Sequence, residues 1–516
     1  MTKKILYLFI ILIIGISASA QSKGLTARIK IDPDRKIGEI DKNIYGNFAE
    51  HLGRCIYGGI YDPGSPLSDE NGFRKDVLEA AKGLNVTILR YPGGNFVSDY
   101  HWLDGIGPKE QRPTRLDLAW KTLEPNTFGT DEFIAYCRKL GTEPYIAVNL
   151  GTGTLDEAKN WVEYCNVKEG PYYAELRKKN GHPEPYNVKY WSLGNEMDGF
   201  WQMGHKNAVD YGKFALEAAK LMKWTSPDIK LIAAGSSNFY GDADPHKWNR
   251  IVLDYLKDYI DYISLHLYVG NRDNDYYAFM ASPLEIEERT SIVEGQIEEA
   301  LSKTRRKTPI YVAWDEYNVW YRARGAGFNT GRNALEEKYN LEDALVIAGF
   351  LNAFIRNAHI IKMANMAQLV NVIAPIFTSK TDMFRQTIYY PLALYANNSF
   401  GTALDAFVDS PTYDTKKRKQ VPYLDVSVAY DDGTVVINVV NRHLDQSIST
   451  RLICQQGQFD GEFSVYEVNG PDIKTENTFG NEPVRTKEKP AIKVNGKSFT
   501  YDFPPHSLTV IKGKIK

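Results

Sequence analysis

Alternation between two apolar patterns constrains the fold of this chain more than any other feature of its sequence. Between residues 43 and 371, short segments that are apolar nearly throughout alternate with longer segments whose apolar residues recur at helical spacing. The short segments are typical of parallel strands covered by helices. Eight strands are expected, at 43–50, 86–92, 143–150, 188–196, 229–236, 260–268, 308–316 and 364–371. Seven helices are expected, at 73–83, 131–140, 155–166, 207–223, 247–258, 285–305 and 342–358.

Eight strands alternating with helices is the count for a (β/α)8 TIM barrel, an α/β fold whose active sites occupy the C-terminal ends of the strands. A doubly wound open sheet is the alternative architecture with the same alternation. No glycine-rich phosphate loop follows the first strand, which counts against the nucleotide-binding form of that alternative.

The pattern changes after about residue 390, where helical spacing gives way to short alternating runs. These runs, at 423–428, 434–439 and 500–503, are separated by turn residues and predict a C-terminal antiparallel β-sandwich domain. The stretch 26–32 is also strand-like, and we expect this N-terminal strand to join the sandwich. The predicted division is a leader at 1–20, an N-terminal strand segment at 21–40, a catalytic barrel at 41–385 and a β-sandwich at 386–516.

The first 20 residues have the pattern of a secretory signal peptide. Lys3 and Lys4 precede an apolar run at residues 5–16, and small residues follow up to Ala20. That run is short for a membrane span, which needs about 20 apolar residues, and no later segment approaches that length. We therefore expect cleavage after Ala20 and an exported protein, periplasmic or secreted, with no membrane anchor.

Composition argues against several classes of function. The 516 residues carry a formal net charge of −2, whereas a nucleic-acid-binding protein normally has a basic excess. The cysteines Cys55, Cys137, Cys165 and Cys454 lack zinc-site spacing. They favour buried free thiols, although an oxidising compartment would permit disulfides. The histidines are scattered without a ligand-like cluster, so no metal and no cofactor are expected.

Polar side chains gather at the predicted C-terminal ends of the strands. Glu196 and Glu316 each end an apolar strand-like run. Two carboxylates brought together from such positions can break a glycosidic bond, one as the acid and the other as the nucleophile. For either glutamate alone, the alternative is an ordinary surface acid. Further strand-end residues are Glu50, His51, Arg90, Asn95, Asn195, His266, Tyr268, Asp315, Trp320, Gln368 and Asn371.

On a barrel these residues would converge on one mouth, and that convergence favours a site for a polar ligand. Single members allow other interpretations. His266 could be a core histidine with satisfied hydrogen bonds, and Arg90 could pair with a barrel carboxylate.

Six motifs carry a more specific signal. They are LRYPGGNF at 89–96, DGIGP at 104–108, WSLGNEMDG at 191–199, DEYNVWY at 315–321, ANMAQLVN at 364–371 and PPHS at 504–507. Together they resemble glycoside hydrolase family 51, the α-L-arabinofuranosidases, over nearly the whole chain after the leader. The resemblance implies a retaining, exo-acting enzyme that removes terminal α-L-arabinofuranosyl residues from arabinose-containing plant polysaccharides or oligosaccharides. Members of the family tend to form hexamers, so a homo-oligomer is expected.

By this resemblance Glu196 matches the general acid/base and Glu316 matches the nucleophile. Asn195 matches the residue that binds the sugar 2-hydroxyl, and Tyr268 the aromatic residue that orients the nucleophile and the ring oxygen. The expected sugar-binding residues are Glu50 and Asn95, at positions that hydrogen-bond arabinose hydroxyls, together with Arg90, Asn195, His266, Tyr268, Trp320 and Gln368.

The assigned roles agree with the physics of a retaining pair, whose carboxylates lie about 5–5.5 Å apart. At that distance an ionised Glu316 raises the pKa of Glu196 and keeps it protonated for its acid step. Once the sugar esterifies Glu316, the repulsion ends and Glu196 can deprotonate water.

Three places depart from the family pattern and leave the leaving-group preference open. Tyr317 stands where Trp is usual, Arg322 where His is usual, and the segment 151–154 lacks an Arg after Gly-Thr.

The first alternative function is a retaining endo-glucanase or xylanase on the same barrel. The second is a carbohydrate-binding protein without activity, and the third is a metal-dependent barrel enzyme such as an isomerase.

Overall fold

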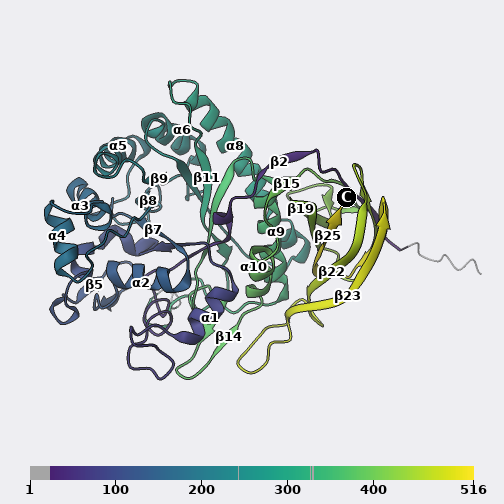
Figure 1. Ribbon diagram of the computed structural model, residues 1–516, viewed down its shortest axis with the longest axis horizontal. Helices are drawn as coiled ribbons and strands as arrows, with labels where there is room; N and C mark the ends of the chain where they lie inside the picture. Colours follow the sequence, from purple (N-terminus) through teal and green to yellow (C-terminus); the bar gives the residue numbers. More distant parts are fainter. Residues whose placement is uncertain (1–23, 242, 326, 328–329) are drawn as a thin grey trace, which may run out of the picture.

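A closed barrel of eight parallel strands forms the centre of the structure (Figure 1). The computed structural model describes residues 24–241, 243–325, 327 and 330–516, so the predicted leader at 1–20 lies outside the described residues. The strands close in the order β10-β11-β12-β3-β4-β7-β8-β9, and all neighbours pair in parallel. They are β3 (Gly46–Phe48), β4 (Ile88–Tyr91), β7 (Glu143–Ala147), β8 (Tyr190–Leu193), β9 (Lys230–Ala233), β10 (Tyr262–Val269), β11 (Tyr311–Val319) and β12 (Ile361–Ala367). Each overlaps a predicted strand, which confirms the barrel over the open sheet.

Helices cover the outside of this barrel (Figure 1). They are α1 (Lys75–Gly83), α2 (Thr130–Leu140), α3 (Leu155–Asn166), α4 (Tyr172–Lys179), α5 (Ala208–Thr225), α6 (Pro245–Leu256), α7 (Tyr276–Met280), α8 (Leu284–Leu301), α9 (Leu341–Arg356) and α10 (Tyr389–Ala396). The seven predicted helices overlap α1, α2, α3, α5, α6, α8 and α9. Thr154, Asn207 and Asp244 begin three of them by accepting a backbone N–H bond. Among the described residues, no helix combines the length and apolarity that a bilayer span requires.

Helix α9 lies between the barrel and the C-terminal sheets (Figure 1). All of its residues from 341 to 355 are buried. Its sequence, LEDALVIAGFLNAFIR, is apolar on nearly every side, as expected of a helix without a solvent-facing surface. The helix therefore fastens the two parts of the chain to each other.

The C-terminal part is a sandwich of two sheets around one apolar core, which includes Ile29, Val439, Leu452 and Phe463. The seven-stranded sheet has the order β2 (Lys36–Glu39), β15 (Thr402–Leu404), β19 (Leu424–Asp431), β20 (Thr434–Asn441), β25 (Ser507–Ile515), β22 (Phe459–Asn469) and β23 (Arg485–Gly496). The four-stranded sheet has the order β16 (Phe407–Asp409), β1 (Thr26–Ile31), β21 (Ile448–Cys454) and β24 (Ser498–Phe503).

The N-terminal strand joins the sandwich as predicted, since β1 lies inside the four-stranded sheet. The sandwich is antiparallel apart from one pairing of this strand, since β1 pairs with β16 in antiparallel and with β21 in parallel. A strand from the far end of the chain is not joined to its neighbour by a hairpin, so no short turn imposes the antiparallel direction. The domain limits at 41–385 and 386–516 stay a prediction.

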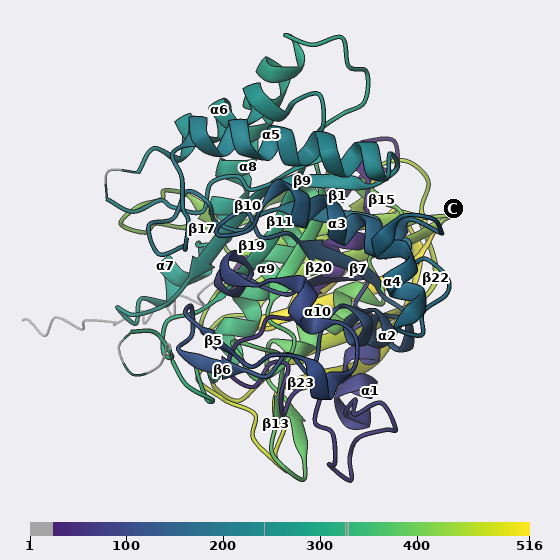
Figure 2. The ribbon, with the colours of Figure 1, turned by 90° about the vertical axis from the view of Figure 1, so that its left-hand side faces the viewer.

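Two smaller features complete the fold. A hairpin of β5 (Arg115–Asp117) and β6 (Thr122–Glu124) lies on the same side of the barrel as α7 and β17 (Thr412–Tyr413) in Figure 2. All four cysteines are buried and free, which confirms the prediction of buried thiols.

Candidate active site

The C-terminal ends of the barrel strands surround a cavity of about 700 Å³. Eight of the ten predicted site residues line it: Glu50, Asn95, Glu196, His266, Tyr268, Glu316, Trp320 and Gln368. The other two, Arg90 and Asn195, are buried and do not line the cavity. Glu316 is only 7% exposed, so the interpretation as a surface acid does not hold for it.

A register shift in β11 explains how Asp315 and Glu316 both reach the site. Ser264 pairs with Ala313, but His266 pairs with Glu316, so β11 carries one residue more than β10 over this interval. Consecutive residues of a regular strand point to opposite faces, and a bulge changes that phase. Asp315 accepts a hydrogen bond from Tyr145 of β7, and Glu316 lines the cavity.

The backbone after β8 turns sharply to present Glu196. The strand ends at Leu193, Gly194 has a φ of 85°, and Glu196 itself has a φ of 43°. A glutamate in this left-handed region is uncommon, and such residues cluster at active sites. The Glu196 carboxylate accepts hydrogen bonds from His266 Nδ1 at 2.9 Å and from Trp201 Nε1 at 2.5 Å.

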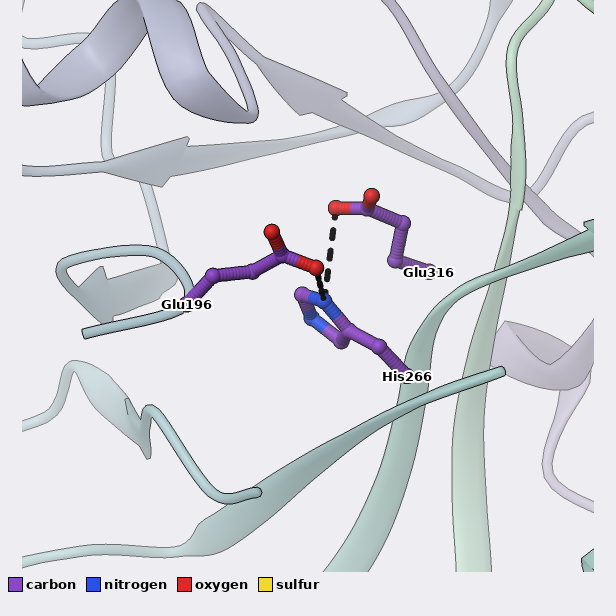
Figure 3. A group of neighbouring side chains, drawn as sticks. All are labelled: Glu196, His266 and Glu316. Atoms are coloured by element: carbon purple, nitrogen blue, oxygen red, sulfur yellow. Dashed lines mark hydrogen bonds and ion pairs between the residues drawn. The ribbon is translucent and has the colours of Figure 1, made fainter. Parts of the chain in front are cut away.

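The carboxylates of Glu196 and Glu316 approach the same ring nitrogen of His266 (Figure 3). The three side chains each place one nitrogen or oxygen within 4.8 Å of the others. His266 Nδ1 lies 3.6 Å from Glu316 Oε2, in addition to its contact with Glu196. One oxygen of Glu196 and one of Glu316 therefore lie close together, as expected of a retaining pair, whose carboxyl groups are about 5–5.5 Å apart.

The environment separates the proton affinities of these groups. Burial and the charge of Glu316 raise the pKa of Glu196, and the bonds from His266 and Trp201 offset only part of that rise. Burial lowers the pKa of His266, but the charge of Glu316 and the bonds to Asp315 and Glu196 outweigh it and raise that pKa to about 10. The imidazole is therefore protonated near neutral pH and donates from both nitrogens.

Arg90 organises the floor below the cavity. Its guanidinium donates to Glu316 Oε2 at 2.9 Å and to Asn195 Oδ1 at 2.5 Å, and it lies 3.5 Å from Asp315. Tyr268 donates to the other Glu316 oxygen at 2.7 Å. Both oxygens of Glu316 thus accept a hydrogen bond, which orients the carboxyl group in the cavity. The interpretation that Arg90 pairs with barrel carboxylates is confirmed.

Glu50 forms a second polar centre at the opposite wall. Its carboxylate accepts from Gln368 Nε2 at 2.8 Å, Trp120 Nε1 at 3.0 Å and the Phe96 backbone N–H at 3.1 Å. Burial raises the pKa of this carboxyl to about 8, and the charge of Glu316 adds to the rise. A Cβ atom on Gly94 would overlap the Glu50 carboxylate, so this close approach needs glycine.

Two tryptophans of the site were not predicted from the sequence. Trp120 lies in the turn of the β5–β6 hairpin, and Trp201 lies in the loop after Glu196. One local signal existed for the hairpin: Asp117 Oδ1 accepts from the N–H groups of residues 119 and 120, the pattern of an Asx turn. Neither residue has a periodic pattern that would point to a cavity.

The three departures from the family motifs do not line the cavity. Tyr317 points away from it and packs edge-on against Phe350 and Phe354 of α9. Arg322 pairs with Asp343 at 2.9 Å. None of these positions contacts the cavity directly, and their effect on the loops around the leaving group stays a prediction.

The same three side chains form the group of acids and histidine that could hold a cation among the described residues: Glu196, His266 and Glu316. A cation at this position would have to displace the proton of His266, because a metal ligand must be deprotonated.

Comparison with known proteins agrees with this geometry. The chain matches the family models of the α-L-arabinofuranosidase 1 domain at residues 80–281 and of the α-L-arabinofuranosidase C-terminal domain at residues 315–507. It is 44% identical to an intracellular exo-α-(1→5)-L-arabinofuranosidase of Bacillus subtilis (strain 168), over 95% of this chain and 99% of that protein. It is 46% identical to an intracellular exo-α-(1→5)-L-arabinofuranosidase of Halalkalibacterium halodurans, over 85% of this chain and 88% of that protein.

A solved structure extends the match to three dimensions. The GH51 α-L-arabinofuranosidase from Thermotoga petrophila RKU-1 superposes with a TM-score of 0.87 at 43% identity. The match covers 95% of this chain and 100% of that one.

These relatives correct the prediction of export. Both bacterial relatives are named intracellular, so the predicted periplasmic or secreted location is contradicted, and the signal peptide expected at residues 1–20 has no support. A basic pair, an apolar run and small residues form a compositional pattern, and such a pattern alone does not establish export.

The barrel, the paired glutamates and the matches over nearly the whole chain lead to one conclusion. This protein is a glycoside hydrolase, and the chain belongs to the α-L-arabinofuranosidases of glycoside hydrolase family 51.

Proposed function

We propose that Glu316 is the nucleophile and Glu196 the general acid/base of a retaining, exo-acting α-L-arabinofuranosidase. The observation that carries this proposal is the placement of both carboxylates within 4.8 Å of the shared His266, inside one cavity. The two groups differ in the way the reaction needs. Glu316 accepts hydrogen bonds at both oxygens, whereas burial and the Glu316 charge raise the pKa of Glu196.

In the first step, a Glu316 oxygen attacks the anomeric carbon and forms an ester with it. The bond to the leaving oxygen breaks, and Glu196 transfers its proton to that oxygen. Trp201 and His266 direct the Glu196 carboxyl toward the bond, since each donates to one of its oxygens.

In the second step, water attacks the anomeric carbon and the ester bond breaks, which restores the Glu316 carboxylate. Esterification has removed the charge of Glu316, so the pKa of Glu196 falls and Glu196 takes the proton of the water. His266, which Asp315 also holds, donates a hydrogen bond to the Glu196 carboxylate during this step.

The glycone is proposed to bind between the catalytic pair and the Glu50 wall. Glu50, Asn95 and Gln368 supply hydrogen-bonding groups for hydroxyls, and Trp120 and Trp320 supply apolar ring surface. We infer terminal α-L-arabinofuranosyl residues as the substrate, including α-(1→5)-linked ones, as in the names of the bacterial relatives. Arabinan, arabinoxylan and arabinogalactan side chains are the candidate polymers.

Chemical rescue with azide tests the two catalytic roles separately. In Glu196→Ala, azide should capture the glycosyl-enzyme and give the α-configured azide, with the configuration of the substrate. In Glu316→Ala, azide should attack the substrate directly and give the β-configured azide. Identical anomers from both variants would contradict the assignment.

Substrate panels test the specificity. The p-nitrophenyl α-L-arabinofuranoside should be cleaved in the presence of EDTA, and the β-D-xyloside and β-D-glucoside should not. A linear α-(1→5)-arabino-oligosaccharide should release only monosaccharide. Internal cleavage products would favour the endo-glucanase or xylanase alternative, and loss of activity in EDTA would favour a metal-dependent enzyme.

We also propose that each chain comprises the predicted barrel domain and the predicted sandwich domain. By resemblance to its family, the chain is proposed to form a homo-oligomer, a hexamer. Light scattering coupled to size exclusion would give the mass directly. A monomeric mass of 58.5 kDa would contradict this proposal.

A further inference from the structure

The outer wall of the active-site cavity carries cations that the proposed reaction does not use. Besides the catalytic His266, three basic side chains line the cavity: Arg289, Arg324 and Lys417. An α-L-arabinofuranosyl residue is uncharged, so its recognition gives no reason for cations at this position. The carboxyl group of Glu50, by contrast, lies at the glycone wall, where it can exchange hydrogen bonds with hydroxyls.

Lys417 comes from the C-terminal part of the chain, and its loop is anchored at the mouth of the barrel. The neighbouring Arg418 donates to both oxygens of Glu288 on α8, at 3.0 and 2.7 Å. At the start of the loop, Tyr413 packs against Tyr277 of α7 with ring centroids 4.8 Å apart. Lys417 itself has no hydrogen bond or ion pair within the described part of the chain, and its side chain is exposed toward the cavity.

Arg324 reaches the same cavity from the segment that follows β11. Its guanidinium lies over the ring of Trp320, 4.4 Å from the centroid. Trp320 is in turn oriented by a bond from its Nε1 to the Ala323 carbonyl at 2.8 Å. Among the described residues, Arg324 has the Trp320 ring as its neighbour and no carboxylate in an ion pair, and its side chain is half-buried. Its charge is therefore available to a group bound in the cavity that it lines.

Arg289 differs from these two cations. It forms an ion pair with Glu285, one turn earlier on α8, and stacks on Phe239 at 3.4 Å from the ring centroid. Its charge is compensated within the wall. Among the described residues that line the cavity, Lys417 and Arg324 are thus cations without a carboxylate partner.

We propose that the leaving-group side of this site binds the carboxylate of a uronic acid, so that the preferred substrates are arabinofuranosyl residues carried on acidic glycans. This inference rests on the proposed function and specifies its substrate class. Lys417 supplies a flexible point charge at the mouth, and Arg324 supplies a planar guanidinium that can bind a carboxylate through two parallel hydrogen bonds. Each exposed charge pair contributes roughly 2- to 5-fold in affinity, and salt screens it.

The test uses a matched pair of substrates. One is an arabinofuranosyl oligosaccharide with a uronic acid next to the branch point, and the other is the same oligosaccharide after reduction of its carboxyl group to a primary alcohol. In low salt, kcat/KM should favour the acidic form by about 10-fold, and 0.5 M NaCl should remove most of that preference. Equal kcat/KM values for the two forms in low salt would overturn the inference.

Variants locate the effect. Lys417→Ala and Arg324→Ala should each reduce the acidic-to-reduced ratio of kcat/KM by about 2- to 5-fold, and the double variant should bring the ratio close to one. Lys419→Ala is the matched control, because Lys419 lies in the same loop but pairs with Asp414 at 3.0 Å and does not line the cavity. Lys419→Ala should leave the acidic-to-reduced ratio of kcat/KM near the wild-type value. If it lowers that ratio as much as Lys417→Ala does, the preference arises from general surface charge, and the proposed site is refuted.

Binding to an inactive variant separates this inference from the proposed function. In Glu316→Ala, calorimetry should give a lower Kd for the acidic oligosaccharide than for its reduced form. If the wild-type protein fails to cleave any arabinofuranoside, the proposed function is wrong, whereas equal Kd values in Glu316→Ala refute the uronate site alone.

Discussion

Replacing His266 with leucine should shift the pH dependence of the enzyme toward alkaline pH. The protonated His266 donates to Glu196 at 2.9 Å and opposes the rise in the pKa of Glu196 that burial and Glu316 cause. A hydrogen bond to a charged group contributes about 1.5–3 kcal/mol, and 1.36 kcal/mol corresponds to one pH unit. The alkaline limb of kcat/KM reports ionisation of the general acid in the free enzyme. In His266→Leu this limb should therefore move up by about one to two pH units, because Glu196 retains its proton to higher pH.

The assay is the pH profile of kcat/KM on p-nitrophenyl α-L-arabinofuranoside, from pH 4 to 10. His266→Asn should recover part of the shift, since an amide can donate to Glu196 but carries no charge. Trp201→Phe removes a neutral donor at 2.5 Å and should give a smaller upward shift. An alkaline limb that stays in place or moves down in His266→Leu would refute the reasoning, because it would mean that His266 does not stabilise the Glu196 carboxylate.

Three further predictions concern the glycone wall. Burial raises the pKa of Glu50 from its ordinary 4.5 to about 8, so this carboxyl contributes stability that is complete below pH 4.5 and lost as the pH rises to 8. In urea titrations between pH 4.5 and 8, the free energy of unfolding of the wild type should fall relative to that of Glu50→Gln by up to about 1.4 kcal/mol per pH unit. Free energies of unfolding that change with pH in the same way for both proteins would contradict this. Trp120→Phe removes the donor to Glu50 and should raise KM for arabinosides by about 2- to 10-fold with a smaller change in kcat; an unchanged KM would show that the bond does not matter for binding. Gly94→Ala should displace Glu50 and lower kcat/KM by about 100-fold, whereas Gly295→Ala on α8, where a Cβ meets no atom within 4 Å, should leave kcat/KM near the wild-type value.

Much of the barrel could be predicted because its strands and longer helices have patterns that repeat along the chain. A strand such as β8 is buried on both faces, and that burial produces a continuous apolar run that is visible in the sequence. Shorter elements were not predicted. Helix α7 has only five residues, less than two helical turns, and β5 and β6 have three residues each. Elements of that length show no periodicity from which to infer them.

The site residues, too, could be predicted where they end long apolar segments but not where they lie in loops. Glu196 and Glu316 were predictable because both end long apolar runs, and parallel strands of a barrel place such ends at one mouth. Trp120, Trp201 and Lys417 were not, because each lies in a loop whose path depends on contacts with distant segments. The sequence also could not show that Arg90 lies under the cavity rather than in its wall, since both positions require the same strand residue.

By itself, the sequence determined the alternation of strands and helices, the sandwich that follows it, and the two glutamates at strand ends. Local patterns encode these features because burial repeats with the period of each element. Only the tertiary structure decided the register shift that lets Asp315 and Glu316 both contact Arg90 and His266, the parallel pairing of β1, and the loop that brings Lys417 from the C-terminal part to the mouth of the barrel. These features depend on contacts between residues far apart in the chain, and no local pattern records such contacts.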